Sequence, residues 1–180
     1  MKYNKILEKL SAGKMSRTEL QDLRSNAISK FKAGDDEAIK VIAAIDVAKP
    51  LDTYILFMGF CPDADINNRL DTEWKAQGIC TFDFPESPPQ VKRFNDISAG
   101  DLVVLKKNLE LGKTMTLHGH GRVTGVAFDE EEKRYLRVSW SAQSEVITVP
   151  AIAATHTVNI KLIELVEAEM PKVFFTWLGL

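Results

Sequence analysis

Cysteine and histidine are scarce in this sequence, which holds 2 cysteines and 3 histidines among 180 residues. Two cysteines are too few for a disulfide framework, so we expect Cys61 and Cys80 to be free thiols. Together with His118, His120 and His156 they include the ligand types that zinc prefers. They form no CxxC or HxxxH pair, however. We therefore predict neither a metal site nor a cofactor.

Long apolar runs are also missing. No stretch approaches the roughly 18 consecutive apolar residues of a membrane-spanning helix, so we predict no membrane segment. The first five residues, from Met1 to Lys5, are basic but lead into a charged amphipathic stretch, which is unlike a signal peptide. These features indicate a cytoplasmic protein.

Familiar catalytic patterns are absent as well. The sequence contains no G-x-S-x-G, no phosphate-cradling glycine loop and no H-E-x-x-H. Asp83 is an unusual acid because it stands in an apolar stretch, where it could bind an exocyclic amino group or simply face water. The sequence therefore favours a non-catalytic function. An enzyme with an unrecognised site, using Asp83 and a histidine, is a third hypothesis.

Positive charge is in short supply for a protein that binds long nucleic acids. The formal net charge is −2, with 10 Lys and Arg against 7 Asp and Glu in residues 1–50, and 13 against 18 in residues 51–180. Proteins that hold a duplex through many phosphates are usually basic, so strong nonspecific binding is not expected. A pocket for one nucleotide needs only a few placed groups and is compatible with this charge.

Residues 1–50, called the helical unit below, have the apolar spacing of three short helices. Ser16 and Glu19 form a capping box that starts the second helix. Asp35 or Asp36 would cap the third helix. The predicted apolar face of that helix is Ile39, Ile42, Ala43 and Val47. We expect such faces to pack within the protein or to form a homodimer. Binding of a protein partner or of nucleic acid is the alternative.

Residues 51–180 alternate between β-favouring runs and helices. The expected strands are Thr53–Met58, Ile79–Phe84, Leu102–Leu105, a stretch from Leu117, Arg134–Trp140 and Glu145–Val149. A helix from Asp63 or Asp65 to Trp74 and a loop over residues 106–116 would separate some of them. This order predicts an α+β fold in which residues 51–180 form a curled β-sheet or barrel with flanking helices.

The stretch from Leu117 alternates between small or apolar residues and polar ones. The odd positions are Leu117, Gly119, Gly121, Val123, Gly125 and Ala127. Because a strand places alternate residues on opposite sides, His118, His120 and Arg122 would share a polar face. That face could contact solvent, a phosphate or the edge of a base. The glycines allow either close approach to a ligand or tight packing in a small barrel.

This order of elements resembles the PUA-like superfamily and, within it, the EVE and YTH-like branch. The residues that carry the resemblance are Tyr54–Phe57, the helix ending at Trp74, Gly78–Phe82, Ile97–Val104 and Gly119–Val123. The resemblance covers residues 51–167 and leaves the helical unit outside. It implies a pseudobarrel that binds RNA or DNA, often by taking one modified base into an aromatic pocket, and a link to restriction and other defence enzymes.

A pocket for a flipped base needs aromatic faces and a few polar groups at its edge. Trp74 and Trp140 are the first choices for its walls, although tryptophan is also commonly buried in a core. The predicted ligand-binding residues are Trp74, Phe82, Asp83, Phe84, His118, His120, Arg122 and Trp140. The leading hypothesis is thus a nucleic-acid-binding module that recognises a modified base.

A protein-binding adaptor or inhibitor is the second hypothesis. It is suggested by the acidic balance of residues 51–180 and by the apolar C-terminal segment from Val173 to Leu180. We expect a last helix there, following Pro171. Its predicted buried face is Val173, Phe174, Trp177 and Leu178. An exposed apolar patch at this end would favour the adaptor, and a buried C-terminus would not.

Overall fold

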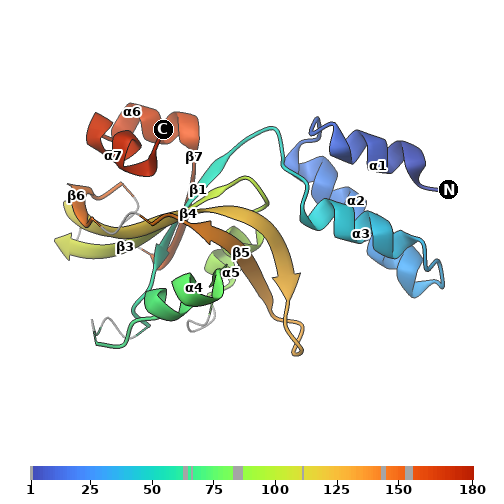
Figure 1. The fold of residues 1–180 in the computed structure, drawn as a ribbon, viewed down its shortest axis with the longest axis horizontal. Coiled ribbons are helices and arrows are strands. Elements are labelled where there is room, and N and C mark those ends of the chain that lie inside the picture. Colours follow the sequence, from blue (N-terminus) through green and yellow to red (C-terminus); the bar gives the residue numbers. More distant parts are fainter. Residues whose placement is uncertain are drawn as a thin grey trace.

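In a computed structural model of the chain, helices and strands are described for residues 2–62, 65, 67–82, 87–110, 112–142, 145–152 and 156–180. Three helices come first, and strands then alternate with helices to the C-terminus (Figure 1). The elements are α1 (Asn4–Ser11), α2 (Arg17–Lys32), α3 (Ala38–Asp46), β1 (Tyr54–Gly59), α4 (Asp71–Gln77), β2 (Ile79–Cys80), α5 (Pro88–Asn95), β3 (Leu102–Glu110), β4 (Thr114–Phe128), β5 (Arg134–Trp140), β6 (Ile147–Pro150), β7 (Val158–Leu162), α6 (Ile163–Glu169) and α7 (Lys172–Leu178).

The strands form one curled mixed sheet in the order β2-β5-β4-β3-β1-β7, with β6 paired to β4. Strands β1 and β3 run parallel, and the other pairs are antiparallel. The long strand β4 pairs with β3 along one edge. Along its other edge it pairs with β6 near its start and with β5 towards its end. The predicted α+β class with a curled sheet and flanking helices is confirmed.

Each face of the sheet has its own apolar core. One core, which includes Phe60, Trp74 and Phe94, lies on the side of α4 and α5. The other, which includes Phe57, Phe174 and Trp177, lies under α6 and α7. These two helix pairs lie on opposite sides of the sheet (Figure 1). A sheet covered on both faces explains why β1 is apolar at successive positions and not at alternate ones.

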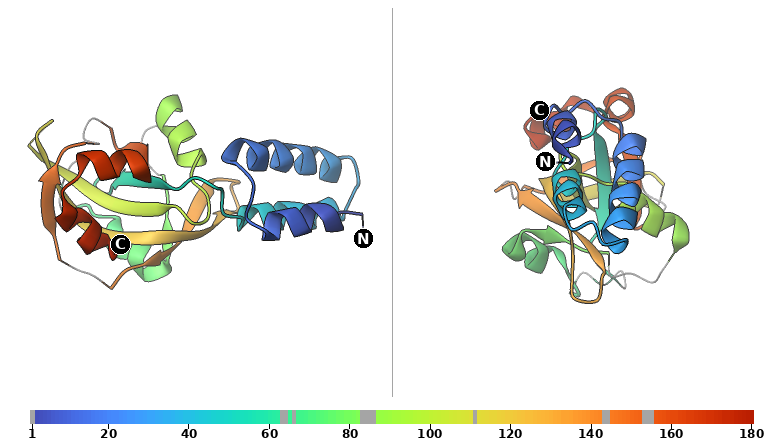
Figure 2. Two further views of the ribbon diagram at one scale, coloured as in Figure 1. Left: turned by 90° about the horizontal axis from the view of Figure 1, so that it is seen from above. Right: turned by 90° about the vertical axis from the view of Figure 1, so that its right-hand side faces the viewer.

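The helical unit, α1 to α3, lies beyond one end of the sheet and has a core of its own (Figure 2). The capping box is confirmed, because Glu19 N donates to Ser16 Oγ and Ser16 N donates to Glu19 Oε2. The predicted face of α3 is wrong. Its buried residues are Ala38, Val41 and Ile45, whereas Ile39 and Val47 are exposed.

Several other element predictions need correction. The expected cap of α3 does not form, because Glu37 occupies that position and Asp35 binds Lys2 and Tyr3 instead. Strand β3 continues to Glu110, so residues 106–116 are mainly strand and not a loop. Helix α4 begins only at Asp71. In the last helix Val173 is exposed, while the other three predicted residues are buried.

One buried ion pair joins the helical unit to the sheet. The Arg17 guanidinium donates to both carboxylate oxygens of Asp101, at 2.9 and 2.6 Å. The Arg17 side chain is 8% exposed and that of Asp101 is not exposed at all. Asp101 also accepts from the backbone N–H groups of Tyr54 and Ser98. Burial raises the pKa of Asp101, and these hydrogen bonds act in the opposite direction.

Candidate ligand-binding cleft

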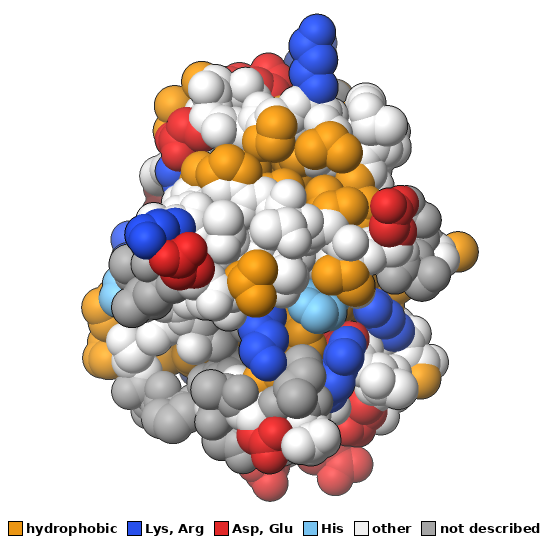
Figure 3. All heavy atoms as spheres, turned by 90° about the vertical axis from the view of Figure 1, so that its left-hand side faces the viewer, with side chains coloured by type: hydrophobic (Ala, Val, Ile, Leu, Met, Phe, Trp, Pro, Cys, Tyr) orange, Lys and Arg blue, Asp and Glu red, His pale blue; other side chains and the backbone are white. Residues whose placement is uncertain are grey.

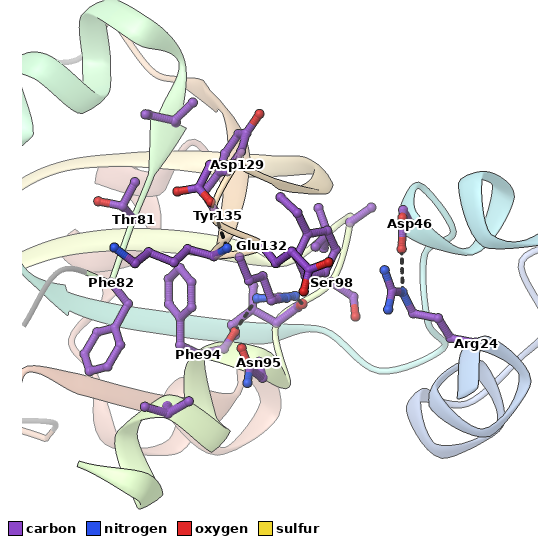
Figure 4. A pocket seen from close by; sticks show the side chains of 18 of the residues that line it. Arg24, Asp46, Thr81, Phe82, Phe94, Asn95, Ser98, Asp129, Glu132 and Tyr135 are labelled. Carbon is purple, nitrogen blue, oxygen red and sulfur yellow. Dashed lines mark hydrogen bonds and ion pairs between the residues drawn. The ribbon is translucent and has the colours of Figure 1, made fainter. Parts of the chain in front are cut away.

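A cleft of about 1190 Å³ lies where the helical unit meets the sheet. Its walls come from α2 and α3 on one side and from β2, α5, β5 and the β4–β5 hairpin on the other (Figure 4). Arg24 and Asp46 reach in from the helical side, and Phe82, Phe94 and Tyr135 lie on the sheet side. We call it the cleft below.

Aromatic rings form much of the sheet-side wall. The rings of Phe82 and Phe94 are stacked, with centroids 5.8 Å apart and planes 29° apart. Phe128 comes from the end of β4, and the Arg24 guanidinium lies 5.0 Å from its ring centroid. Tyr135 follows on β5. Flat apolar faces beside guanidinium groups are suited to stacking on a planar ligand.

Arg134 is a half-buried cation in the wall of the cleft. Its Nη1 donates to the Phe94 carbonyl at 2.7 Å, and its Nη2 donates to the Ile97 carbonyl. Burial lowers the pKa of Arg134 to about 10, so the group stays charged at neutral pH. It makes no salt bridge with a carboxylate within the described ranges. Backbone carbonyls therefore accept the hydrogen bonds of the Arg134 guanidinium, and one of these bonds helps to fix the position of Phe94.

Among the described residues that line the cleft, the formal charges balance. Three cations line it, which are Arg24, Lys133 and Arg134. Three carboxylates also line it, which are Asp46, Asp129 and Glu132. Arg24 and Asp46 form an ion pair, because Arg24 Nε lies 2.8 Å from Asp46 Oδ1. A wall with balanced charge does not favour a chain of phosphates, and it is compatible with a neutral ring that carries polar edges.

Of the eight predicted site residues, Phe82 lines the cleft. Asp83 and Phe84 lie outside the described residues. The sequence reasoning missed Arg24, Phe94 and Arg134, which come from three separate elements. The signal for them is weak: Phe94 and Arg134 lie at or near the end of an element, and Arg24 lies in the middle of α2.

The two predicted tryptophan walls are built into the protein interior. Trp74 is 2% exposed, and its Nε1 donates to Thr81 Oγ1 at 3.0 Å. Trp140 is partly buried, and its Nε1 donates to the carbonyls of Trp74 and Ile79. Both ring N–H groups therefore bind neighbouring elements. Neither tryptophan lines the cleft.

The predicted shared face of His118, His120 and Arg122 is wrong. The pairing of β3 with β4 shifts between Leu105 and Lys106, which leaves His118 as an extra residue in β4. The His118 ring then lies 4.9 Å from that of Phe60, in the core region of α4. His120, which is 8% exposed, lies 4.6 Å from the Trp177 ring on the opposite side.

Arg122 is exposed and donates to the Gly100 carbonyl at 2.8 Å. In the part of the chain that the structure describes, no group of three or more His, Cys, Asp or Glu side chains is placed to hold a metal ion. Cys61 is half-buried and Cys80 is buried, and neither forms a disulfide in the described structure. No described helix is long and apolar enough to cross a membrane.

The glycines of β4 permit close packing. A Cβ on Gly121 would lie 2.6 Å from Val138 Cγ1 and 2.8 Å from the Ser139 carbonyl oxygen. A Cβ on Gly119 would lie 2.8 Å from Lys75 Nζ. Packing is thus the explanation for these two positions.

No family model, curated protein or solved structure matches this chain in comparisons with known proteins.

Proposed function

We propose that the chain is a non-catalytic, PUA-like module of the EVE and YTH-like type that binds nucleic acid and takes a modified base into the cleft. The observation that carries the proposal is the group of aromatic rings and guanidinium groups where the helical unit meets the curled sheet. The sheet class and the turn from Ile97 to Asp101 agree with the resemblance in the sequence.

The cleft supplies the two things that a flipped base requires. Phe128 and Tyr135 offer planar surfaces, and each stacked base contributes ~1–3 kcal/mol of binding free energy. Gln21, Asn95 and Ser98 offer polar groups that could read the edge of a base. The balanced charge supports recognition of one base over retention of a long duplex. A link to restriction or another defence system is part of this proposal and follows from the resemblance alone.

Fluorescence anisotropy with short DNA and RNA strands that carry different modified bases tests this function. Phe128→Ala should weaken binding of the recognised strand by about 5-fold to 150-fold, the equivalent of one lost stack. Phe128 is 41% exposed, so the variant should fold. Leu165→Ala, at a site that is 56% exposed on α6, is the matched control. A broad panel without any binding, or equal effects of both variants, would refute the proposal.

Self-association or a protein partner is the second candidate function, and one observation favours it. The helical unit exposes Phe31, Ile39 and Val47 at 42%, 47% and 57%. The C-terminal segment offers less support, because Phe174 and Trp177 are buried. Sedimentation of the wild type and of Ile39→Glu distinguishes the two candidates. A wild-type protein that is monomeric at all concentrations would rule out homodimer formation.

A further inference from the structure

A second cluster of charge lies at the end of the sheet opposite the helical unit. Figure 3 views this end face and shows a histidine side chain bordered by Lys and Arg side chains. Arg69, Lys75 and Lys107 all act electrostatically on the His118 ring, and the Asp71 carboxylate acts in the opposite direction. We call these five residues the His118 cluster.

The geometry of the His118 cluster is fixed by buried partners. Asp71, whose side chain is 3% exposed, accepts from Arg69 Nε at 2.8 Å and from Arg69 Nη2 at 2.7 Å. Lys75 Nζ lies 3.5 Å from the same carboxylate and donates to the His118 carbonyl at 2.9 Å. The Phe60 ring contacts both the Arg69 guanidinium and the His118 ring. Two of the cations are thereby held in place before any ligand arrives.

The cluster has more positive charge than its own carboxylate can compensate. Asp71 is shared by Arg69 and Lys75, and Lys107 makes no salt bridge within the described ranges. Burial lowers the pKa of His118, and the three cations lower it further against the effect of Asp71. In a protein of net charge −2 this local excess requires an explanation. A bound anion would provide the missing negative charge.

The His118 ring can itself take part. Its Nε2 lies 2.9 Å from Thr116 Oγ1, and that hydroxyl donates to the Lys107 carbonyl at 3.2 Å. Because the hydroxyl has one proton, it accepts from His118 Nε2 when it donates to the carbonyl. Nδ1 is then the nitrogen that gains a proton when the ring becomes charged.

We propose that the His118 cluster is a binding site for a phosphate group, with Arg69, Lys75 and Lys107 supplying the positive charge and His118 a further donor when protonated. The site is separate from the cleft and does not depend on the function proposed for it. The phosphate can be free or part of a nucleic-acid backbone, because the chemistry of recognition is the same.

NMR of the His118 Cε1–H resonance during titration with inorganic phosphate, against sodium chloride of equal ionic strength, tests the site. Phosphate should shift the resonance saturably and raise the pKa of His118, because an anion stabilises the charged ring. Lys107→Gln should weaken phosphate binding about fivefold, as expected for one lost cation near the surface. Lys40→Gln, at an exposed position of α3, is the matched control and should change nothing.

Lys107→Gln is preferred to an Arg69 variant, since Lys107 leaves no buried carboxylate without a partner. An unmodified single-stranded oligonucleotide forms the second arm. If the oligonucleotide shifts the His118 resonance and Lys107→Gln weakens its binding, the site takes backbone phosphate. If only inorganic phosphate does so, the site takes a free phosphate. Equal His118 resonances in phosphate and chloride, or wild-type binding by folded Lys107→Gln, would overturn the site. Neither result bears on the Phe128 test of the cleft.

Discussion

The cleft and the His118 cluster lie at opposite ends of the same sheet and differ in how they manage charge. In the cleft, three cations face three carboxylates among the described residues, and the rings of Phe128 and Tyr135 supply flat surface. In the His118 cluster, Arg69 and Lys75 share the Asp71 carboxylate, and Lys107 adds a third positive charge. The first arrangement is suited to the faces of a ring and the second to an anion. The two regions should therefore respond differently to salt, because screening weakens charge–charge attraction far more than stacking.

The largest expected effect comes from Arg17→Ala, which should disrupt the cleft and leave the His118 cluster intact. It leaves Asp101 buried without its cation, and loss of one partner of a buried pair costs about 3–5 kcal/mol. Urea unfolding measures the loss. The helical wall of the cleft depends on this pair, so base binding should fall too. The phosphate response of folded Arg17→Ala at His118 should stay unchanged.

Asp101→Asn in the Arg17→Ala background is the matched second variant. It removes the uncompensated carboxylate, and should recover part of the lost stability. Arg17→Ala with wild-type stability would contradict the role given to the pair.

Gly121→Ala ranks second and tests the sheet between the two regions. Its Cβ would meet Val138 and the Ser139 backbone, which cannot move as a flexible side-chain end can. Overpacking of this kind costs about 1–3 kcal/mol. Thermal unfolding followed by circular dichroism measures it. A variant as stable as the wild type would mean that β4 and β5 separate easily.

Acid should weaken the attachment of α7 to the sheet. His120 Nε2 is buried and has no hydrogen-bond partner in the described structure. Burial, and then Lys75, lower the pKa of His120 against a hydrogen bond with the Trp177 backbone. The folded pKa lies below the unfolded value of about 6.5. The stability of the neutral form is therefore complete above pH ~6.5 and is lost as pH falls through the folded pKa.

Unfolding at a series of pH values checks this, and His120→Gln should flatten the acid side of the curve. His118 has a pKa shifted in the same direction. For that reason His118→Gln is the comparison that separates the two histidines. An unchanged acid side in His120→Gln would contradict the assignment.

Gly119→Ala should have the smallest effect on stability, and it tests the His118 cluster without disturbing the cleft. The Cβ would displace the end of the Lys75 side chain, which is flexible, so the fold should tolerate it. Phosphate binding at the His118 cluster should weaken, because Lys75 moves. Base binding in the cleft should not change. The NMR titration and the anisotropy assay read the two outcomes separately.

The sequence predicted local features well. Ser16 and Glu19 form their capping box, because residues three positions apart determine it. It did not predict the bulge at His118, since only the pairing of β3 with β4 creates it. The same holds for Arg134, whose environment is provided by Phe94 and Ile97, about 40 positions earlier. Contacts distant in sequence leave no periodic signal.

The Arg17–Asp101 pair also bears on how the protein folds. The turn that contains Asp101 lies directly before β3, a central strand of the sheet. The charge of Asp101 is compensated only once α2 has docked. A sheet that forms before the helical unit arrives would carry a buried carboxylate without a counter-ion, which is unfavourable. The two segments that composition separates at residue 50 should therefore unfold in one cooperative transition.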